Sequence, residues 1–296
     1  MNKIKLNEVI LTQPLILKGL YYAGSKHKVI NEIKQYLPDR IKNLYIPFCG
    51  GLNDVINIKA DEYYLNDNCQ QLIELYNWFK KVPSFAYIDN AIKCLINYNW
   101  LSDDNKEGYL QLREDYNNTS TWKNEKLLTL ICHSFSNQIR FNNKGEFNLP
   151  FGMRSYNKES EKRLNNLTEF FKNNYVNLMY GDYKIFFNIY HKFIGKDDFV
   201  LIDPPYVQSD STYNKNWNED DLIKLLEHLN DTKVRFGLTE FLFYKGDLNI
   251  VLNNWIKKNE INLKVIKLNS NFDNSNYQRK SDIGITEEFY ITNYIK

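Results

Sequence analysis

The chain has 296 residues, with 38 Lys or Arg against 36 Asp or Glu and a formal net charge of +2 at pH 7. Its 43% apolar and 15% aromatic residues supply an ample core, which excludes wholesale disorder, and the length predicts one large α/β domain or one domain with a sizeable insertion. The balanced charge neither requires nor excludes a nucleic-acid partner, because binding depends on where the cations cluster.

The N-terminal residues, MNKIKLNEVILTQP, contain no apolar segment followed by small residues, so we expect no signal peptide. No apolar run approaches the roughly 20 residues needed to span a bilayer. The four cysteines lack CxxC spacing and are expected to be small buried side chains in a reducing cytoplasm; they are Cys49, Cys69, Cys94 and Cys132. The sequence therefore predicts a soluble, cytoplasmic protein without a metal site.

Short β-branched and aromatic runs alternate with helical patterns along the chain, which predicts a mostly parallel sheet with helices on both faces. In chain order, the predicted strands are residues 43–46, 62–65, 177–180, 199–202, 234–238, 263–268 and 289–292. The predicted helices include residues 26–36, 220–229 and 248–257. This pattern indicates an α/β fold of the doubly wound kind.

From residue 72 to residue 168 the strand signal fades, and apolar residues recur at helical spacing, as in residues 88–96 and 127–135. We interpret residues 72–168 as a helical insertion. Residues 1–71 and 169–296 then form the α/β domain.

The sharpest chemical signal follows the strand predicted at 199–202, where Asp203 precedes Pro204, Pro205 and Tyr206. Two prolines prevent further ladder bonding, so the carboxylate is held at the carboxyl edge of the sheet, where open α/β folds bind ligands. A rigid turn with Asp203 as its acceptor is the alternative interpretation. The acid before the prolines and the aromatic residue after them favour a site.

This combination suits the activation of an aromatic amine, whose lone pair is conjugated into its ring. The Asp203 carboxylate and the Pro204 carbonyl can accept both N–H groups, favour localisation of the lone pair toward a methyl donor and stabilise the positive charge that develops on nitrogen. Tyr206 can stack on a base that has left its duplex. No Ser or Cys nucleophile is required.

A second signal lies at residues 45–51 (YIPFCGG), where a predicted strand runs into a glycine turn. Such a turn lets the backbone approach a nucleoside cofactor closely. Asp67 closes the next strand about 20 residues later, where an acid commonly binds ribose hydroxyls. Its alternative role is a helix N-cap for the stretch from Cys69. Together the two features favour cofactor binding.

Several blocks, in this order and over nearly the whole chain, resemble the Dam-type (D12 class) DNA adenine methyltransferases. They are residues 22–26 (YAGSK), 47–50 (PFCG), 140–142 (RFN), 144–152 (KGEFNLPFG) and 203–206 (DPPY), and then Arg279, Lys280, Glu287, Glu288 and residues 291–294 (ITNY). The resemblance implies a Rossmann-like methyltransferase fold in which residues 72–168 recognise the DNA target. It also implies S-adenosyl-L-methionine as cofactor and S-adenosyl-L-homocysteine as product.

The resemblance implies cofactor contacts for matching positions, namely Tyr22, Lys26, Phe48, Gly50, Asp67 and Asp203. It places Asp182 at the adenine edge of the cofactor, with a helix N-cap as the equally weighted alternative. The chain departs from the family in the cofactor region. Tyr22 stands at a usual Trp, Ser25 and Leu52 at usual glycines, and Ile46 at a usual acid.

Between His133 and Arg163, six Lys or Arg stand against three Asp or Glu and are interleaved with aromatic residues. A solvated helical face over an aromatic interior is the alternative explanation. The resemblance favours DNA contacts, in which cations bind phosphates and Arg or Asn reads base edges. The candidates are Lys18, Asn137, Arg140, Asn142, Lys144, Asn148 and Arg154.

The resemblance suggests GATC as the target sequence. Two departures bear on that target, because Met153 stands at a usual Arg and the spacing from Asn137 to Arg140 is one residue shorter than in the family.

The leading hypothesis is a site-specific DNA adenine-N6 methyltransferase that acts on a flipped adenine, within a restriction-modification pair or as an orphan methylase. Methylation of the exocyclic amine of cytosine is the rival reaction, and a DNA-binding regulator with weakened catalysis is the rival class. A dehydrogenase lacks support because no GxGxxG fingerprint is present. The expected partners are double-stranded DNA and, in a restriction-modification pair, a cognate restriction endonuclease; we expect a monomer and no membrane.

Overall fold

The computed structural model describes residues 16–22, 24–209, 217–231, 234–270 and 284–295. Their centre is one sheet with the strand order β3-β2-β1-β4-β5-β8-β7, beside which β6 pairs with β5. The strands are β1 (Asn43–Ile46), β2 (Glu62–Asp67), β3 (Tyr175–Tyr180), β4 (Phe199–Ile202), β5 (Phe236–Tyr244), β6 (Asp247–Leu248), β7 (Lys264–Lys267) and β8 (Glu287–Thr292). The first five strands of the order are parallel, and β8 runs antiparallel to β5 and β7. The predicted mostly parallel α/β fold is confirmed.

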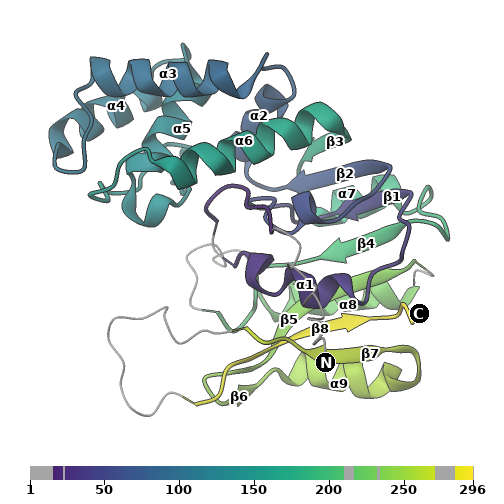
Figure 1. Cartoon of the computed structure of the whole chain (residues 1–296). Helices are drawn as coiled ribbons and strands as arrows, with labels where there is room; N and C mark the ends of the chain where they lie inside the picture. Colours follow the sequence, from purple (N-terminus) through teal and green to yellow (C-terminus); the bar gives the residue numbers. More distant parts are fainter. Residues whose placement is uncertain (1–15, 23, 210–216, 232–233, 271–283, 296) are drawn as a thin grey trace, which may run out of the picture.

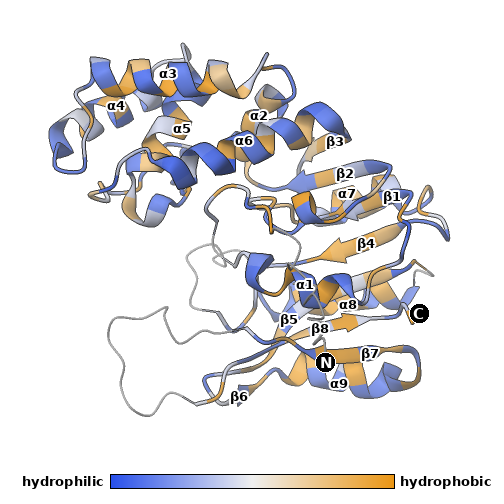
Figure 2. Cartoon of the chain, in the orientation of Figure 1, coloured by the Kyte–Doolittle hydropathy of each residue, from blue (hydrophilic) through white to orange (hydrophobic). Residues whose placement is uncertain are grey.

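Alternate side chains of the strands build a separate apolar core on each face of the sheet. In β1, Leu44 and Ile46 belong to one core, whereas Tyr45 belongs to the other. The first core takes side chains from α1 (Ile30–Lys34) and α2 (Gln70–Phe79) and continues into the helices between residues 85 and 173. The second core takes side chains from α7 (Tyr183–Tyr190), α8 (Glu219–Asp231) and α9 (Ile250–Asn259). Helices therefore cover both faces, and their hydrophilic sides face outward (Figures 1 and 2).

A group of helices lies beyond one edge of the sheet (Figure 1). It consists of α3 (Phe85–Tyr98), α4 (Lys106–Asn118) and α5 (Lys123–His133), in which α3 and α4 both pack on α5. The long helix α6 (Lys158–Asn173) contacts α3 and also α2, so it joins this group to the sheet. The helical character expected between residues 72 and 168 is confirmed.

Two expectations about single elements were wrong. The helix expected at 26–36 is divided into η1 (Lys26–Lys28) and α1, because Val29 (φ −107°, ψ 1°) leaves helical geometry. The strand expected at 234–238 is β5, which is longer because β8 and β6 pair with it. Helix α7 begins directly after Asp182, in agreement with the N-cap interpretation of that residue, although its run YKIFFNIY does not by itself separate helix from strand by periodicity.

The cysteines differ in burial, contrary to the expectation that all are buried. Cys49 and Cys132 are buried, Cys69 is half-buried and Cys94 is exposed. The Cys94 side chain lies on α3 between the buried positions Ile92 and Leu95 and on the other side of that helix. Among the described residues, no helix combines the length and apolarity that crossing a membrane requires.

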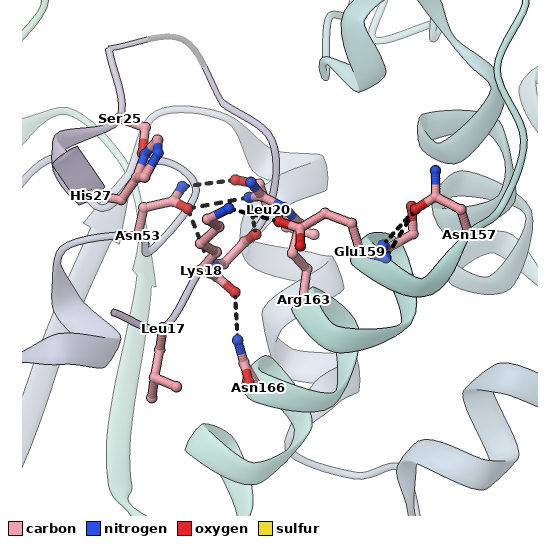
Figure 3. Close-up of polar contacts among 12 residues, drawn as sticks. Leu17, Lys18, Leu20, Ser25, His27, Asn53, Asn157, Glu159, Arg163 and Asn166 are labelled. Carbon is pink, nitrogen blue, oxygen red and sulfur yellow. Dashed lines mark hydrogen bonds and ion pairs between the residues drawn. The ribbon is translucent and has the colours of Figure 1, made fainter. Parts of the chain in front are cut away.

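The N-terminal segment 17–21 is tied to α6 and to the turn after β1 by polar contacts (Figure 3). Arg163 of α6 is 8% exposed, and its Nη1 donates a hydrogen bond to the Gly19 carbonyl at 2.9 Å. Its Nε donates to Glu159 Oε1 at 3.1 Å. Asn53 of the turn accepts a hydrogen bond from Gly19 N at 3.0 Å. Arg163 is therefore a link between the helical group and the loops at the sheet.

Arg163→Met is expected to lower the free energy of unfolding by about 3 kcal/mol, because it removes one partner from a buried, charged hydrogen-bond network. Urea unfolding followed by circular dichroism measures the change. Arg154→Met is the control, since Arg154 is exposed and its loss is expected to cost less than about 0.5 kcal/mol. Equal unfolding midpoints for the two variants would contradict the structural role of Arg163.

Candidate active site

The loops that follow four parallel strands meet at one edge of the sheet, because the carboxyl ends of parallel strands face the same way. They are the turn at residues 47–51 after β1, the end of β2 at Asp67, the start of α7 at Asp182, and residues 203–206 after β4. The Asn66 side chain joins two of them, donating to the Pro47 carbonyl at 2.9 Å and to the Gly181 carbonyl at 3.0 Å. The catalytic and cofactor candidates named from the sequence thus converge on one edge.

Asp203 is anchored through one carboxylate oxygen. Its Oδ1 lies 2.8 Å from Lys26 Nζ and accepts a hydrogen bond from the Thr239 hydroxyl at 2.6 Å. The Tyr206 hydroxyl lies 3.2 Å from the same oxygen. Within the described part of the chain, no hydrogen bond reaches Asp203 Oδ2 or the Pro204 carbonyl, and the Asp203 side chain keeps 22% exposure. Two acceptors are therefore left for a ligand.

Burial and neighbouring charges shift the pKa values of Asp203 and Lys26. Burial raises the pKa of Asp203, and the neighbouring Lys26 and Thr239 act against that rise. Burial by itself lowers the pKa of Lys26, but the carboxylates of Asp203 and Glu288 outweigh it, so the pKa lies above its ordinary value. Lys26 therefore remains an ammonium group in the folded protein.

Two further buried acids lie beside Asp203 and Lys26, and neither of them was expected from the sequence to have a role. Glu288 of β8 is 4% exposed, and its Oε1 lies 3.3 Å from Lys26 Nζ. Glu240 of β5 is fully buried, and its Oε2 has no hydrogen-bond partner among the described residues. Burial raises the pKa of Glu240 well above its usual range, which favours the neutral acid. An acid within an apolar strand, as in residues 239–241 and 287–289, is the signal that indicates such groups.

The position of Tyr206 differs from the expectation that its ring is free to stack on a base. The residue is 8% exposed, and its ring centroid lies 4.5 Å from that of Phe241 and 4.8 Å from Lys26 Nζ. The hydroxyl donates a hydrogen bond of 2.5 Å to Glu288 Oε1, which holds the ring in this packing. Little of the ring is left for stacking, so Tyr206 is better placed to act through its hydroxyl.

The turn after β1 has the geometry of a close-approach loop. Gly50 has a φ of +43°, and a Cβ there would lie 3.2 Å from the Tyr22 ring. The Gly50 amide donates to Asp67 Oδ2 at 2.9 Å, and its carbonyl accepts the Tyr76 hydroxyl at 2.5 Å. Glycine is needed at this position because an added side chain would be strained and would press on Tyr22.

The two acids after β2 and β3 hold helix starts as well as lying at the site. Asp67 is 6% exposed, and its Oδ1 accepts a hydrogen bond from Cys69 N at 3.0 Å. Cys69 is itself the N-cap residue of α2, so Asp67 supports that helix from outside it. Asp182 is the N-cap of α7 and accepts from Lys184 N at 2.8 Å. Each carboxylate oxygen can accept a second hydrogen bond from a ligand.

The residues around Phe48 fit a nucleoside cofactor that carries a positive charge. The Trp217 ring lies 5.4 Å from that of Phe48, and its Nε1 is a buried donor without a partner among the described residues. Asn66 Oδ1 is a buried acceptor that also has no partner among the described residues. An adenine edge offers an acceptor for the Trp217 N–H and a donor for the Asn66 oxygen. Burial and, to a smaller extent, the Asp203 charge raise the pKa of Asp54 to about 6. Because this value is still below 7, the Asp54 carboxylate carries a negative charge at neutral pH. The donor set therefore fits S-adenosyl-L-methionine.

Five of the seven candidate DNA contacts are exposed, or paired in ways that a ligand can replace. Lys144 and Arg154 are exposed. Lys18 forms an ion pair with Glu159 at 3.0 Å (Figure 3). Arg140 donates through Nε to Asn148 Oδ1 at 2.8 Å and through Nη2 to the carbonyl of the same residue at 3.0 Å.

Asn137 and Asn142 have their side-chain amides engaged in the fold. Asn137 is 5% exposed, and its Nδ2 donates to the Ile131 and Cys132 carbonyls at 3.2 and 2.8 Å. Asn142 Oδ1 accepts hydrogen bonds from Lys144 N and from the backbone N–H two residues further on, at 2.9 and 3.0 Å. In this arrangement the two asparagines shape the loops, and Asn137 is not presented to a base.

A family model described as D12 class N6 adenine-specific DNA methyltransferase matches residues 22–277. The Type II methyltransferase M.FokI of Planomicrobium okeanokoites is 33% identical, with 99% of this chain and 46% of that protein covered. The modification methylase StsI of Streptococcus sanguinis is 32% identical over 96% of this chain and 44% of its own length. A DNA adenine methylase of Vibrio cholerae is 30% identical, covering 66% of this chain and 67% of that enzyme. The chain spans about half the length of the first two relatives.

Proposed function

The chain belongs to the D12 class N6 adenine-specific DNA methyltransferase family, and we propose that it transfers a methyl group from S-adenosyl-L-methionine to the exocyclic amine of an adenine in duplex DNA. One observation carries this proposal. Asp203 is fixed through Oδ1, while Oδ2 and the Pro204 carbonyl accept no hydrogen bond within the described residues. These two acceptors suit the two N–H groups of an aromatic amine.

The chain's own groups supply the activation. Asp203 Oδ2 and the Pro204 carbonyl accept hydrogen bonds from the two N–H groups of the amine, which favours localisation of the nitrogen lone pair and stabilises the positive charge that develops on nitrogen. Lys26 and Thr239 hold the carboxylate in place, so little reorganisation is needed as the reaction proceeds. After transfer, the methylated amine loses one proton toward Asp203 or solvent and becomes neutral.

In this proposal, the loops at the carboxyl edge of the sheet also hold the cofactor. Tyr22, Phe48 and Gly50 line it, Asp67 accepts hydrogen bonds from its ribose, and Asp182 lies toward its adenine. When bound, S-adenosyl-L-methionine supplies an electrophilic methyl group on a sulfonium. The negative charge of Asp54 at neutral pH favours that cation over the uncharged sulfur of S-adenosyl-L-homocysteine. This difference assists the exchange of product for new cofactor.

We further propose that the segment between α5 and α6 recognises DNA and that the target adenine is flipped out of the helix, since a stacked base cannot reach Asp203. Two bridges, Ser134 with Phe151 and Phe141 with Phe147, hold this segment together. Lys144 and Arg154 are its exposed cations, and Arg140 with Asn148 is the pair suited to base edges. The proposed target is GATC, the proposed state is a monomer, and a cognate restriction endonuclease is the proposed partner in a restriction-modification pair.

Purified protein is expected to transfer labelled methyl groups from S-adenosyl-L-methionine to unmethylated duplex DNA and to produce N6-methyladenine. Hydrolysis to nucleosides and mass spectrometry identify the product, and mapping of methylated positions in cells that express the chain identifies the target. Methylation of cytosine alone would overturn the assignment of the base. Absence of transfer across many duplex sequences would favour a DNA-binding regulator.

A further inference from the structure

Glu288 lies at the point where the last strand meets the catalytic segment. Strand β8 pairs with β5 so that Glu288 lies opposite Phe241, and Thr239 of β5 contacts Asp203. Glu288 Oε1 contacts both the Tyr206 hydroxyl and Lys26 Nζ, and its Oε2 accepts the Ser270 hydroxyl. Both oxygens of this nearly inaccessible carboxylate are thus occupied by the protein.

We propose that Glu288 is a positioning residue for methyl transfer, which keeps the Asp203 carboxylate a strong hydrogen-bond acceptor by holding the Tyr206 hydroxyl and sharing the Lys26 ammonium. The proposal rests on the proposed function and assigns to Glu288 no contact with substrate or cofactor.

The Tyr206 hydroxyl has a single proton to donate. The hydroxyl oxygen lies 2.5 Å from Glu288 Oε1 and 3.2 Å from Asp203 Oδ1, so the hydroxyl donates its proton to Glu288 in the shorter hydrogen bond. A neutral amide oxygen at 288 is a weaker acceptor than a carboxylate oxygen, so with Gln there the hydroxyl shares more of its proton with Asp203 Oδ1. That third donor draws electron density from the carboxylate and weakens it as an acceptor for the target amine.

The Lys26 ammonium has three protons and, among the residues that the structure describes, three acceptors. They are the Gly24 carbonyl at 2.6 Å, Asp203 Oδ1 at 2.8 Å and Glu288 Oε1 at 3.3 Å. The positive charge is therefore divided between two carboxylates. If Glu288 is replaced by a neutral residue, the Lys26 ammonium interacts more strongly with Asp203. The Asp203 carboxylate then becomes a weaker hydrogen-bond acceptor.

The other charged and titratable groups around Asp203 define the electrostatic setting. Burial raises the pKa of Glu240 and so favours its uncharged, protonated form, and Asp54 has a raised pKa of about 6. Burial raises the pKa of Asp203, Lys26 lowers it, and Glu288 raises it. Removing the Glu288 charge therefore lowers the pKa of Asp203, whereas removing Lys26 raises it.

The test compares Glu288→Gln with Glu287→Gln, its neighbour on the same strand, which is paired instead with Lys267 at 2.5 Å. Glu288→Gln is expected to lower the single-turnover rate about tenfold, because a weaker acceptor stabilises the transition state less. Its dissociation constants for S-adenosyl-L-methionine and for DNA are expected to stay within about twofold of the wild type. The acid limb of its pH–rate profile is expected to move to lower pH, and Glu287→Gln is expected to match the wild type.

A merely structural role predicts a lower melting temperature with the acid limb unmoved, and that result would overturn the proposal, as would a wild-type rate and profile. A second measurement separates this proposal from the proposed function. The carboxyl carbon of Asp203, labelled with ¹³C and assigned by its absence in Asp203→Asn, is titrated by NMR. If the titration midpoint falls in Glu288→Gln, the electrostatic role holds even for a wild-type protein that transfers no methyl to DNA; an unchanged midpoint overturns the role.

Discussion

Asp203→Asn is expected to reduce single-turnover methyl transfer by about 100- to 1,000-fold, the scale of loss when one preorganised hydrogen-bond group is removed from a reaction centre. The orientation of the new side chain follows from its neighbours. Lys26 and Thr239 both donate to the position of Oδ1, so the amide oxygen occupies that position and the NH₂ group takes the place of Oδ2. A donor then faces the target amine, and the negative charge is lost.

The measurement is a rapid-quench assay with enzyme in excess over duplex DNA, which isolates the chemical step from product release. Cofactor affinity and the melting temperature are measured in parallel to show that the fold persists. Asp197→Asn is the matched control, because Asp197 is an exposed acid just before the same strand, at its opposite end. A rate above about a tenth of wild type in Asp203→Asn would reject the proposed role of the carboxylate.

Lys26→Met is expected to lower the free energy of unfolding by about 3–5 kcal/mol at neutral pH, because it removes the cation from a buried group of charges and leaves carboxylates unpaired. The ammonium is 5% exposed and contacts Asp203 and Glu288. The variant is also expected to move the acid limb of the rate profile to higher pH, since Lys26 lowers the pKa of Asp203. This shift is opposite in sign to that expected for Glu288→Gln.

The loss of stability in Lys26→Met has a defined pH dependence. The pKa of Asp203 is already raised in the folded protein, mainly by burial, so folding favours its protonated form, and stability is lost as the pH rises through the folded pKa. Without Lys26 that pKa rises further and the loss grows. The deficit against wild type is therefore expected to be smaller at pH 5 than at pH 8.

Thermal melting at both pH values measures the deficit. Lys28→Met is the control, because Lys28 lies in the same short helix and is exposed. A Lys26→Met variant that melts like the control at both pH values would show that the buried ammonium does not stabilise the site.

The strands that are buried on both faces were predictable from the sequence. The bounds of β1 and β4 agree with the sequence-based expectation, since a strand covered on both sides is a short continuous apolar run that ends at turn residues. The bounds of β5 were not predictable, because its length depends on pairing with β8 and β6. Local patterns carry no information about a partner that lies some 50 residues away.

By itself, the sequence predicted the order of most strands and helices, the helical character between residues 72 and 168 and the acid held before two prolines at 203–206. These depend on local rules: periodicity, β-branched composition and the missing amide of proline. Only the tertiary structure decided which side chains surround the acid. Lys26, Thr239 and Glu288 come from η1, β5 and β8, and they meet because β8 runs antiparallel beside β5. That convergence also decided which oxygen of Asp203 is bound by Lys26 and Thr239, because strand order is a property of the packed sheet and not of any segment.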